Sequence, residues 1–114
     1  MRVYRLSDLP RSETSHIFGG VIPGAFISRG GVGFEPPGCI PHADEPRHVH
    51  AGGEIFVLVQ GRAVVHLDDG DQPLEAGDVG VIEPDENHHL ESDREDPCVV
   101  VWLECGPERH LDQR

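Results

Sequence analysis

Residues 47–61, RHVHAGGEIFVLVQG, decide how this chain can fold. His48 and His50 are two residues apart, so their side chains share one face of a β-strand. A straight strand would also place Glu54 on that face, but about 13 Å beyond His50 at roughly 3.3 Å per residue. The two glycines in between permit a bend or bulge that returns Glu54 towards the histidines. The stretch therefore predicts three polar side chains gathered where a buried apolar strand begins.

Two imidazoles and one carboxylate on a rigid face suit a first-row divalent metal ion. A fourth ligand is expected from PDENHHLES, which offers two adjacent histidines. If His88 points inward, so does Leu90. His89 and Glu91 then face water, whereas the opposite choice would bury Glu91 and expose Leu90. The alternation favours His88 as the inward residue.

The rest of the chain consists of short apolar stretches separated by turn residues. DDGDQ is a hairpin signal, and a long 3.6-residue periodicity is absent. This pattern predicts an all-β sandwich or small barrel with its core at about residues 30–104. Residues 1–15 and 106–114 are polar and are expected to be peripheral. The expected strands lie within residues 16–34, 54–61, 62–67, 73–84, 87–92 and 98–105.

Length and charge limit the classes of function. The 114 residues, numbered 1–114, suit a single domain. The net charge of -12 and the absence of lysine exclude a basic surface for nucleic acid or an anionic membrane, and also Schiff-base chemistry. The chain contains no apolar run of membrane-spanning length and no signal peptide. Its three cysteines form no CxxC pair, so we expect reduced thiols and a cytoplasmic location.

These motifs resemble those of single-domain cupins. The first cupin motif is similar to His48-Val49-His50, three residues, Glu54, six residues and Gly61. The second is similar to the segment from the Gly77-Asp78 turn through Pro84 to His88. The resemblance covers roughly residues 30–104. It implies a jelly-roll barrel of antiparallel strands, a double-stranded antiparallel β-sandwich, with a metal inside it.

The resemblance also implies the ligands of that metal, which are His48, His50, Glu54 and His88. Such a set leaves about two positions of an octahedron open for water, O₂ or substrate. A divalent transition metal is expected, with Fe(II) favoured and Mn, Ni, Zn or Cu as alternatives. The expected function is that of a dioxygenase-like metalloenzyme acting on a small oxygenated or carboxylated metabolite. The alternatives are a Lewis-acid isomerase or ring-opening enzyme for a sugar acid, and a sensor that binds a small molecule without turnover.

Several other residues are candidates for the pocket or for a partner surface. Those expected around the metal are Phe34, His42, Phe56, Leu58 and Trp102, although each could be ordinary core or loop. An arginine could clamp a substrate carboxylate, and Arg29, Arg47 and Arg62 are candidates that surface charge would also explain. Exposed sheet edges predict a homodimer, which a purely monomeric mass in light scattering would contradict.

Overall fold

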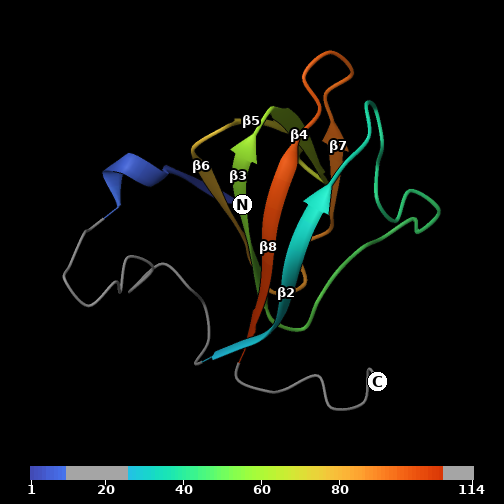
Figure 1. The fold of residues 1–114 in the computed structure, drawn as a ribbon. Coiled ribbons are helices and arrows are strands. Elements are labelled where there is room, and N and C mark those ends of the chain that lie inside the picture. Colours follow the sequence, from blue (N-terminus) through green and yellow to red (C-terminus); the bar gives the residue numbers. More distant parts are fainter. Residues whose placement is uncertain (10–25, 107–114) are drawn as a thin grey trace.

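The computed structural model describes residues 1–9 and 26–106, and it is an all-β jelly-roll barrel built from two antiparallel sheets (Figure 1). One sheet has the strand order β1-β6-β3-β8-β2 and the other has the order β5-β4-β7. The predicted fold class is therefore confirmed. The strands are β1 (Arg2–Arg5), β2 (Phe26–Phe34), β3 (Gly53–Gln60), β4 (Arg62–Leu67), β5 (Gly70–Glu75), β6 (Asp78–Ile82), β7 (His88–Ser92) and β8 (Val99–Gly106), with a short 3-10 helix at Leu6–Asp8.

The main core lies between the two sheets. Strand β3 supplies Phe56 and Leu58 to it, β4 supplies Val65 and β7 supplies Leu90. Alternate residues point to this core, as the period of two along a strand requires. Glu54 and His88 of the candidate site start from β3 and β7, so the core fixes their backbone positions.

A second cluster covers the opposite face of the five-stranded sheet. Ile55 and Val81 are both 0% exposed and pack there with Leu9. Strand β3 is thus buried on both faces, which explains its uninterrupted apolar run. Strand β1, near the start of the chain, pairs with β6 and forms one edge of the five-stranded sheet. Residues 10–25 lie outside the described part of the chain, and so do the first strands expected within residues 16–34.

Strand β2 is a single nine-residue strand at one edge of its sheet. Val32 and Phe34 project from it with 51% and 76% of their surfaces exposed. Phe34 was expected in the pocket, and the structure instead places it on the outer face. In the part of the chain that the structure describes, no helix has the length and apolar character needed to cross a membrane.

His66 on β4 links its neighbouring strands on the outside of the smaller sheet. Its Nδ1 lies 2.8 Å from Oδ1 of Asp71, and its Nε2 lies 3.0 Å from Oε1 of Glu91. The contact with Asp71, then that with Glu91, raises the pKa of His66 above 6.5 against the opposing effect of burial. The charged imidazole therefore stabilises the fold fully below about pH 6.5, and this contribution is lost as pH rises through the folded-state pKa.

We accordingly expect His66→Gln to cost more stability in acid than in base. Because His66 is 37% exposed, the difference should stay below about 1 kcal/mol. Urea unfolding of both proteins at about pH 5.5 and about pH 9 measures it, since titration of other groups is common to both. An equal cost at the two pH values would contradict the assigned role.

Candidate metal centre

Two segments hold the polar side chains together at one end of the barrel. His48 and His50 lie just before β3, and the chain bends at residues 51–52 so that Glu54 returns to them. The second segment runs from the end of β6 to His88 at the start of β7. Its backbone is tied to the first, because the amide of His88 donates to the carbonyl oxygen of His48 at 3.1 Å. A similar bond joins the amide of Asp85 to His50 at 2.9 Å.

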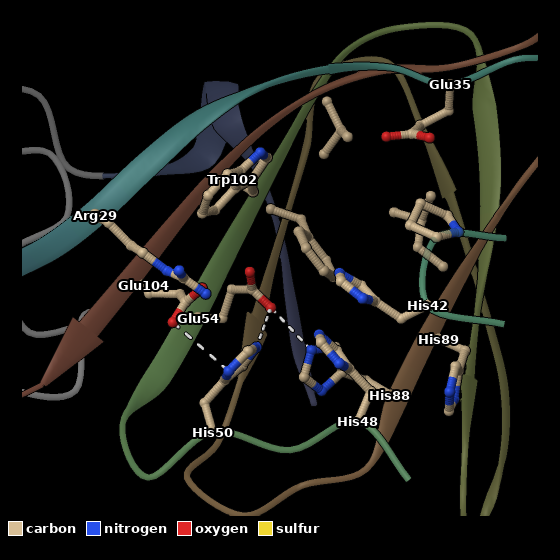
Figure 2. A pocket seen from close by; sticks show the side chains of 14 residues that line it. Arg29, Glu35, His42, His48, His50, Glu54, His88, His89, Trp102 and Glu104 are labelled. Atoms are coloured by element: carbon tan, nitrogen blue, oxygen red, sulfur yellow. Dashed lines mark hydrogen bonds and ion pairs between the residues drawn. The ribbon is translucent and has the colours of Figure 1, made fainter. Parts of the chain in front are cut away.

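The structure brings all four expected ligand residues together (Figure 2). The centre of the His48 ring lies 4.7 Å from the centre of the His50 ring and 5.0 Å from that of the His88 ring. Nε2 of His88 is 2.8 Å from Oε1 of Glu54, and Nε2 of His50 is 3.4 Å from the same oxygen. One ring nitrogen from each histidine lies within 4.8 Å of those of the other two, which is a grouping that could hold a metal ion.

Each imidazole turns its Nδ1 towards an oxygen atom. Nδ1 of His48 is 2.7 Å from Oε2 of Glu45, and that of His88 is 2.8 Å from the carbonyl oxygen of Glu86. Nδ1 of His50 is 3.6 Å from Oε1 of Glu104. Partners of this kind fix the tautomer and orientation of metal-binding histidines. They leave the Nε2 atoms as the nitrogens able to bind an ion.

The contact between His88 and Glu54 shows that the residues fit a cation. A carbonyl oxygen only accepts, so Nδ1 of His88 carries the proton that it donates to Glu86. Nε2 of His88 faces the Glu54 carboxylate at 2.8 Å, so either a proton or a metal ion must lie between these two atoms. In addition, Nε2 of His50 is buried and makes no hydrogen bond in the described residues. A proton can satisfy one contact, whereas a divalent metal ion suits the whole set of three imidazoles and one carboxylate.

The pKa directions of Glu54 and His48 suit metal binding, whereas the contact with Glu54 raises the pKa of His50, so a metal ion would displace a proton there. Burial alone would raise the pKa of Glu54, but the contacts with His50 and His88 outweigh it and lower the pKa to about 2. Glu54 is thus ionised at neutral pH. Burial lowers the pKa of His48, although its contact with Glu45 acts in the opposite direction. His48 is therefore neutral at pH 7, as a ligand must be.

A cavity of about 210 Å³ opens onto these residues, which is room for a small molecule. The expected pocket residues His42, Phe56 and Trp102 line it. Leu58 does not, because it lies deeper in the core at 1% exposed, and Phe34 points away from the barrel. The lining consists of Arg29, Glu35, Pro41, His42, His48, His50, Glu54, Phe56, His88, His89, Leu90, Val100, Trp102 and Glu104.

The alternation argument for the two adjacent histidines holds with one change. His88 is 2% exposed and points inward with Leu90. The sequence predicted that His89 would face open water, and the structure differs. His89 lies at the rim of the cavity, where its Nε2 is 2.8 Å from the carbonyl oxygen of Glu45. His42 also lies at the rim, and its ring stacks on that of His48 at 4.2 Å.

Three acidic residues of the site were not expected from the sequence. Glu104 is 3% exposed and stands opposite Glu54 in the register of β3 and β8. Two features of the sequence could have identified Glu104: it is the lone charge of an apolar strand, and it has the same parity as Trp102. Glu45 and Glu35 lie in or beside the loop at residues 35–46, where no strand period applies.

Two of the three arginines that were candidates for binding a substrate carboxylate lie away from the cavity. Arg47 pairs with Asp68 at 3.3 Å, and Arg62 pairs with Asp93 at 3.1 Å. Both are exposed surface contacts of the kind that contribute little to stability. Arg29 differs from them, because it lines the cavity.

Comparisons with known proteins agree with this geometry. A search of curated proteins found no match. A cupin protein from Bacteroides fragilis is 20% identical with a TM-score of 0.61, and the match covers 72% of this chain and 68% of that one. A cupin-superfamily sugar phosphate isomerase from Silicibacter pomeroyi is 20% identical with a TM-score of 0.51, over 61% of this chain and 45% of that one.

One matched structure is more similar in sequence. It comes from the crystal structures of the DMSP lyases RdDddP and RnDddQII, is 30% identical with a TM-score of 0.54, and is matched over 68% of this chain and 38% of that chain. The family model of the cupin domain matches residues 39–104, a segment that contains all four expected ligand residues. Since this segment is more than half of the chain, the chain belongs to the cupin family.

Proposed function

We propose that this cupin is a mononuclear metal-dependent enzyme acting on a small oxygenated or carboxylated metabolite. His48, His50, Glu54 and His88 hold the metal ion. The observation that carries the proposal is the 2.8 Å contact between Nε2 of His88 and Glu54, at a cavity where two more imidazoles meet. The favoured metal is Fe(II), and Mn, Ni, Zn and Cu also suit the donor set.

The protein's own residues prepare the cavity for chemistry. A divalent metal held there supplies polarisation of a substrate oxygen or, as Fe(II), electrons for a reaction with O₂. Phe56, Leu90 and Val100 line the cavity with apolar surface, which excludes water and strengthens electrostatic interactions inside it. Glu104 adds a buried carboxylate that can accept a proton from a bound substrate.

Dioxygenase chemistry is the first subclass, because the expected ligand set with Fe(II) suits it. The second candidate is acid–base chemistry without O₂, as in a lyase or isomerase. Glu104 favours this candidate, since a redox reaction does not require a second buried carboxylate in the cavity. The 30% identical match among structures of DMSP lyases also supports it, whereas the sugar phosphate isomerase at 20% identity supports the fold alone.

One experiment separates these candidates. Protein loaded with Fe(II) or with Zn(II) is given a panel of small hydroxy acids and carboxylic acids, and O₂ uptake and product formation are followed together. Turnover with Fe(II) only, with O₂ consumed, supports the dioxygenase. Turnover with both metals and without O₂ uptake supports the lyase or isomerase. Ligand binding without product under either metal would contradict an enzyme and favour a sensor that binds the small molecule.

Glu45 should increase the affinity of the site for metal by holding His48 in place. Its carboxylate lies 2.7 Å from Nδ1 of His48 and so orients the ring. We expect Glu45→Ala to weaken Zn(II) binding by about tenfold or more, measured by competition with a chromophoric chelator. Asp44→Ala is the matched control, because Asp44 lies in the same loop, is exposed and has no ion pair in the described residues. Equal losses in both variants would mean that Glu45 does not act through His48.

A further inference from the structure

We infer that Arg29 binds a carboxylate group of the substrate, which makes the substrate a small carboxylate. This inference rests on the proposed function and adds the substrate class to it. It starts from the position of Arg29, which extends from β2 over the cavity on the side of Glu104 and Glu54 (Figure 2).

Two contacts hold the guanidinium of Arg29 in place. Its Nε donates to Oε2 of Glu104 at 2.8 Å, and its Cζ lies 5.9 Å from the centre of the Trp102 ring. Within residues 1–9 and 26–106, no hydrogen bond or ion pair involves its two terminal nitrogens. A guanidinium fixed at Nε and on an aromatic face, with both terminal nitrogens available, suits a carboxylate that accepts two parallel bonds.

The glycines of β2 make room for this arrangement. Gly31 pairs with Trp102 across β2 and β8, and a Cβ at Gly31 would lie 3.0 Å from Cζ2 of the indole. The absence of that Cβ allows the ring to lie flat on β2 beside the guanidinium. Arg29 and Gly31 have the same parity, so both belong to the face of β2 that looks into the barrel.

The charges along the cavity single out Arg29 as the group that can bind an anion. Among the described residues that line the cavity Arg29 is the only arginine, and the chain has no lysine, whereas Glu35, Glu54 and Glu104 are all acidic. Glu35 lies at the opposite end of the cavity from Arg29 (Figure 2). The two residues are six positions apart, about 20 Å along an extended chain. A carboxylate of the ligand is therefore expected at the Arg29 end of the cavity and not at the Glu35 end.

The fluorescence of Trp102 reports binding directly, because it is the only tryptophan of the chain. The probes are propionate and its neutral isostere propionamide, each titrated into metal-free and Zn(II)-loaded protein. The main variant is the double change Arg29→Gln with Glu104→Gln, which removes both charges of the pair and leaves no unpaired buried carboxylate. Arg29→Lys is the second variant, since it keeps the positive charge but cannot donate two parallel hydrogen bonds to a carboxylate. Arg47→Gln, at an exposed arginine outside the cavity, is the control.

We expect wild-type protein to bind propionate more tightly than propionamide. The double variant should lose about tenfold or more in propionate affinity with and without Zn(II), and Arg29→Lys should lose less. Propionamide binding and the Arg47→Gln variant should change by less than about twofold. Thermal unfolding checks that each variant is folded.

Two results overturn the inference, and they differ from failure of the proposed function. One is a folded double variant or Arg29→Lys variant that binds propionate as wild-type protein does. The other is wild-type protein that takes up Zn(II) but shows no saturable binding of propionate, which leaves the metal site standing. Propionate binding that depends on Arg29 in a protein that takes up no metal would instead support the Arg29 subsite and contradict the metalloenzyme.

Discussion

Replacing His88 with alanine is expected to weaken Zn(II) binding by about a hundredfold or more. His88 supplies a nitrogen in contact with the Glu54 carboxylate, and its Nδ1 is already committed to the carbonyl oxygen of Glu86. The next histidine along β7, His89, cannot replace it, because its Nε2 lies against the carbonyl oxygen of Glu45 at the rim. Competition titration against a chelator of known affinity measures the loss.

His89→Ala is the matched control for this prediction. His89 is adjacent in sequence and also touches the cavity, but its Nε2 lies against the carbonyl oxygen of Glu45. We expect less than about tenfold loss of Zn(II) affinity in that variant. Because His88 is 2% exposed, His88→Gln serves as a second variant of similar size, and circular dichroism checks the fold of each. If His89→Ala lost as much affinity as His88→Ala, the inward and outward assignments would be wrong.

The second large effect concerns stability. Gly61→Ala is expected to destabilise the fold by about 3 kcal/mol or more. Gly61 has a φ of 74°, in the left-handed region, and a Cβ there would lie 2.2 Å from the carbonyl oxygen of Pro97 and 2.7 Å from that of Asp96. Both are backbone atoms, so relief of the clash requires the loop before β8 to move. That loop is also bonded to the turn, since the amide of Arg62 donates to Asp96 at 2.9 Å.

Gly70→Ala separates the clash from the backbone strain. Gly70 also has a positive φ, at 135°, but nothing lies within 4 Å of the position of its Cβ. This variant should cost only the strain, about 1–3 kcal/mol, and should be less destabilised than Gly61→Ala. Urea unfolding of both variants gives the comparison. Equal destabilisation would mean that the contact of Gly61 with residues 96–97 has no energetic role.

The sequence predicted those parts of the structure that depend on local period and turn chemistry. The shared parity of His88 and Leu90 is a local property of a strand, and β7 buries both side chains. His48 and His50 lie before β3 and outside any strand, so the bend at residues 51–52 and not the strand period brings them to Glu54. The hairpin between β4 and β5 was visible in its turn residues. The first motif placed Gly61 after Glu54 with six residues between them, and the structure explains why glycine is needed there, because its φ is in the left-handed region.

The parts that the sequence did not reveal depend on contacts between distant segments. Phe34 was misplaced because FISRGGVGF has three glycines among its last five residues, so no side-chain pattern marks its buried face. Arg29 and Glu104 meet only through the pairing of β2 with β8, which joins residues 75 positions apart. Glu45 reaches His48 from an irregular loop in which His42 has a positive φ of 60°. Neither contact follows from strand period.

The most direct test of the metal site is the metal content of the protein, purified without an affinity tag or chelator, next to His48→Ala. We expect close to one equivalent of a transition metal in the wild-type protein, favouring iron, and little in the variant, which should remain folded. Near-stoichiometric iron would support the dioxygenase, whereas zinc, nickel or manganese would support acid–base chemistry. Wild-type protein that holds no metal, even after exposure to divalent ions, would contradict the assignment of these residues as a metal centre.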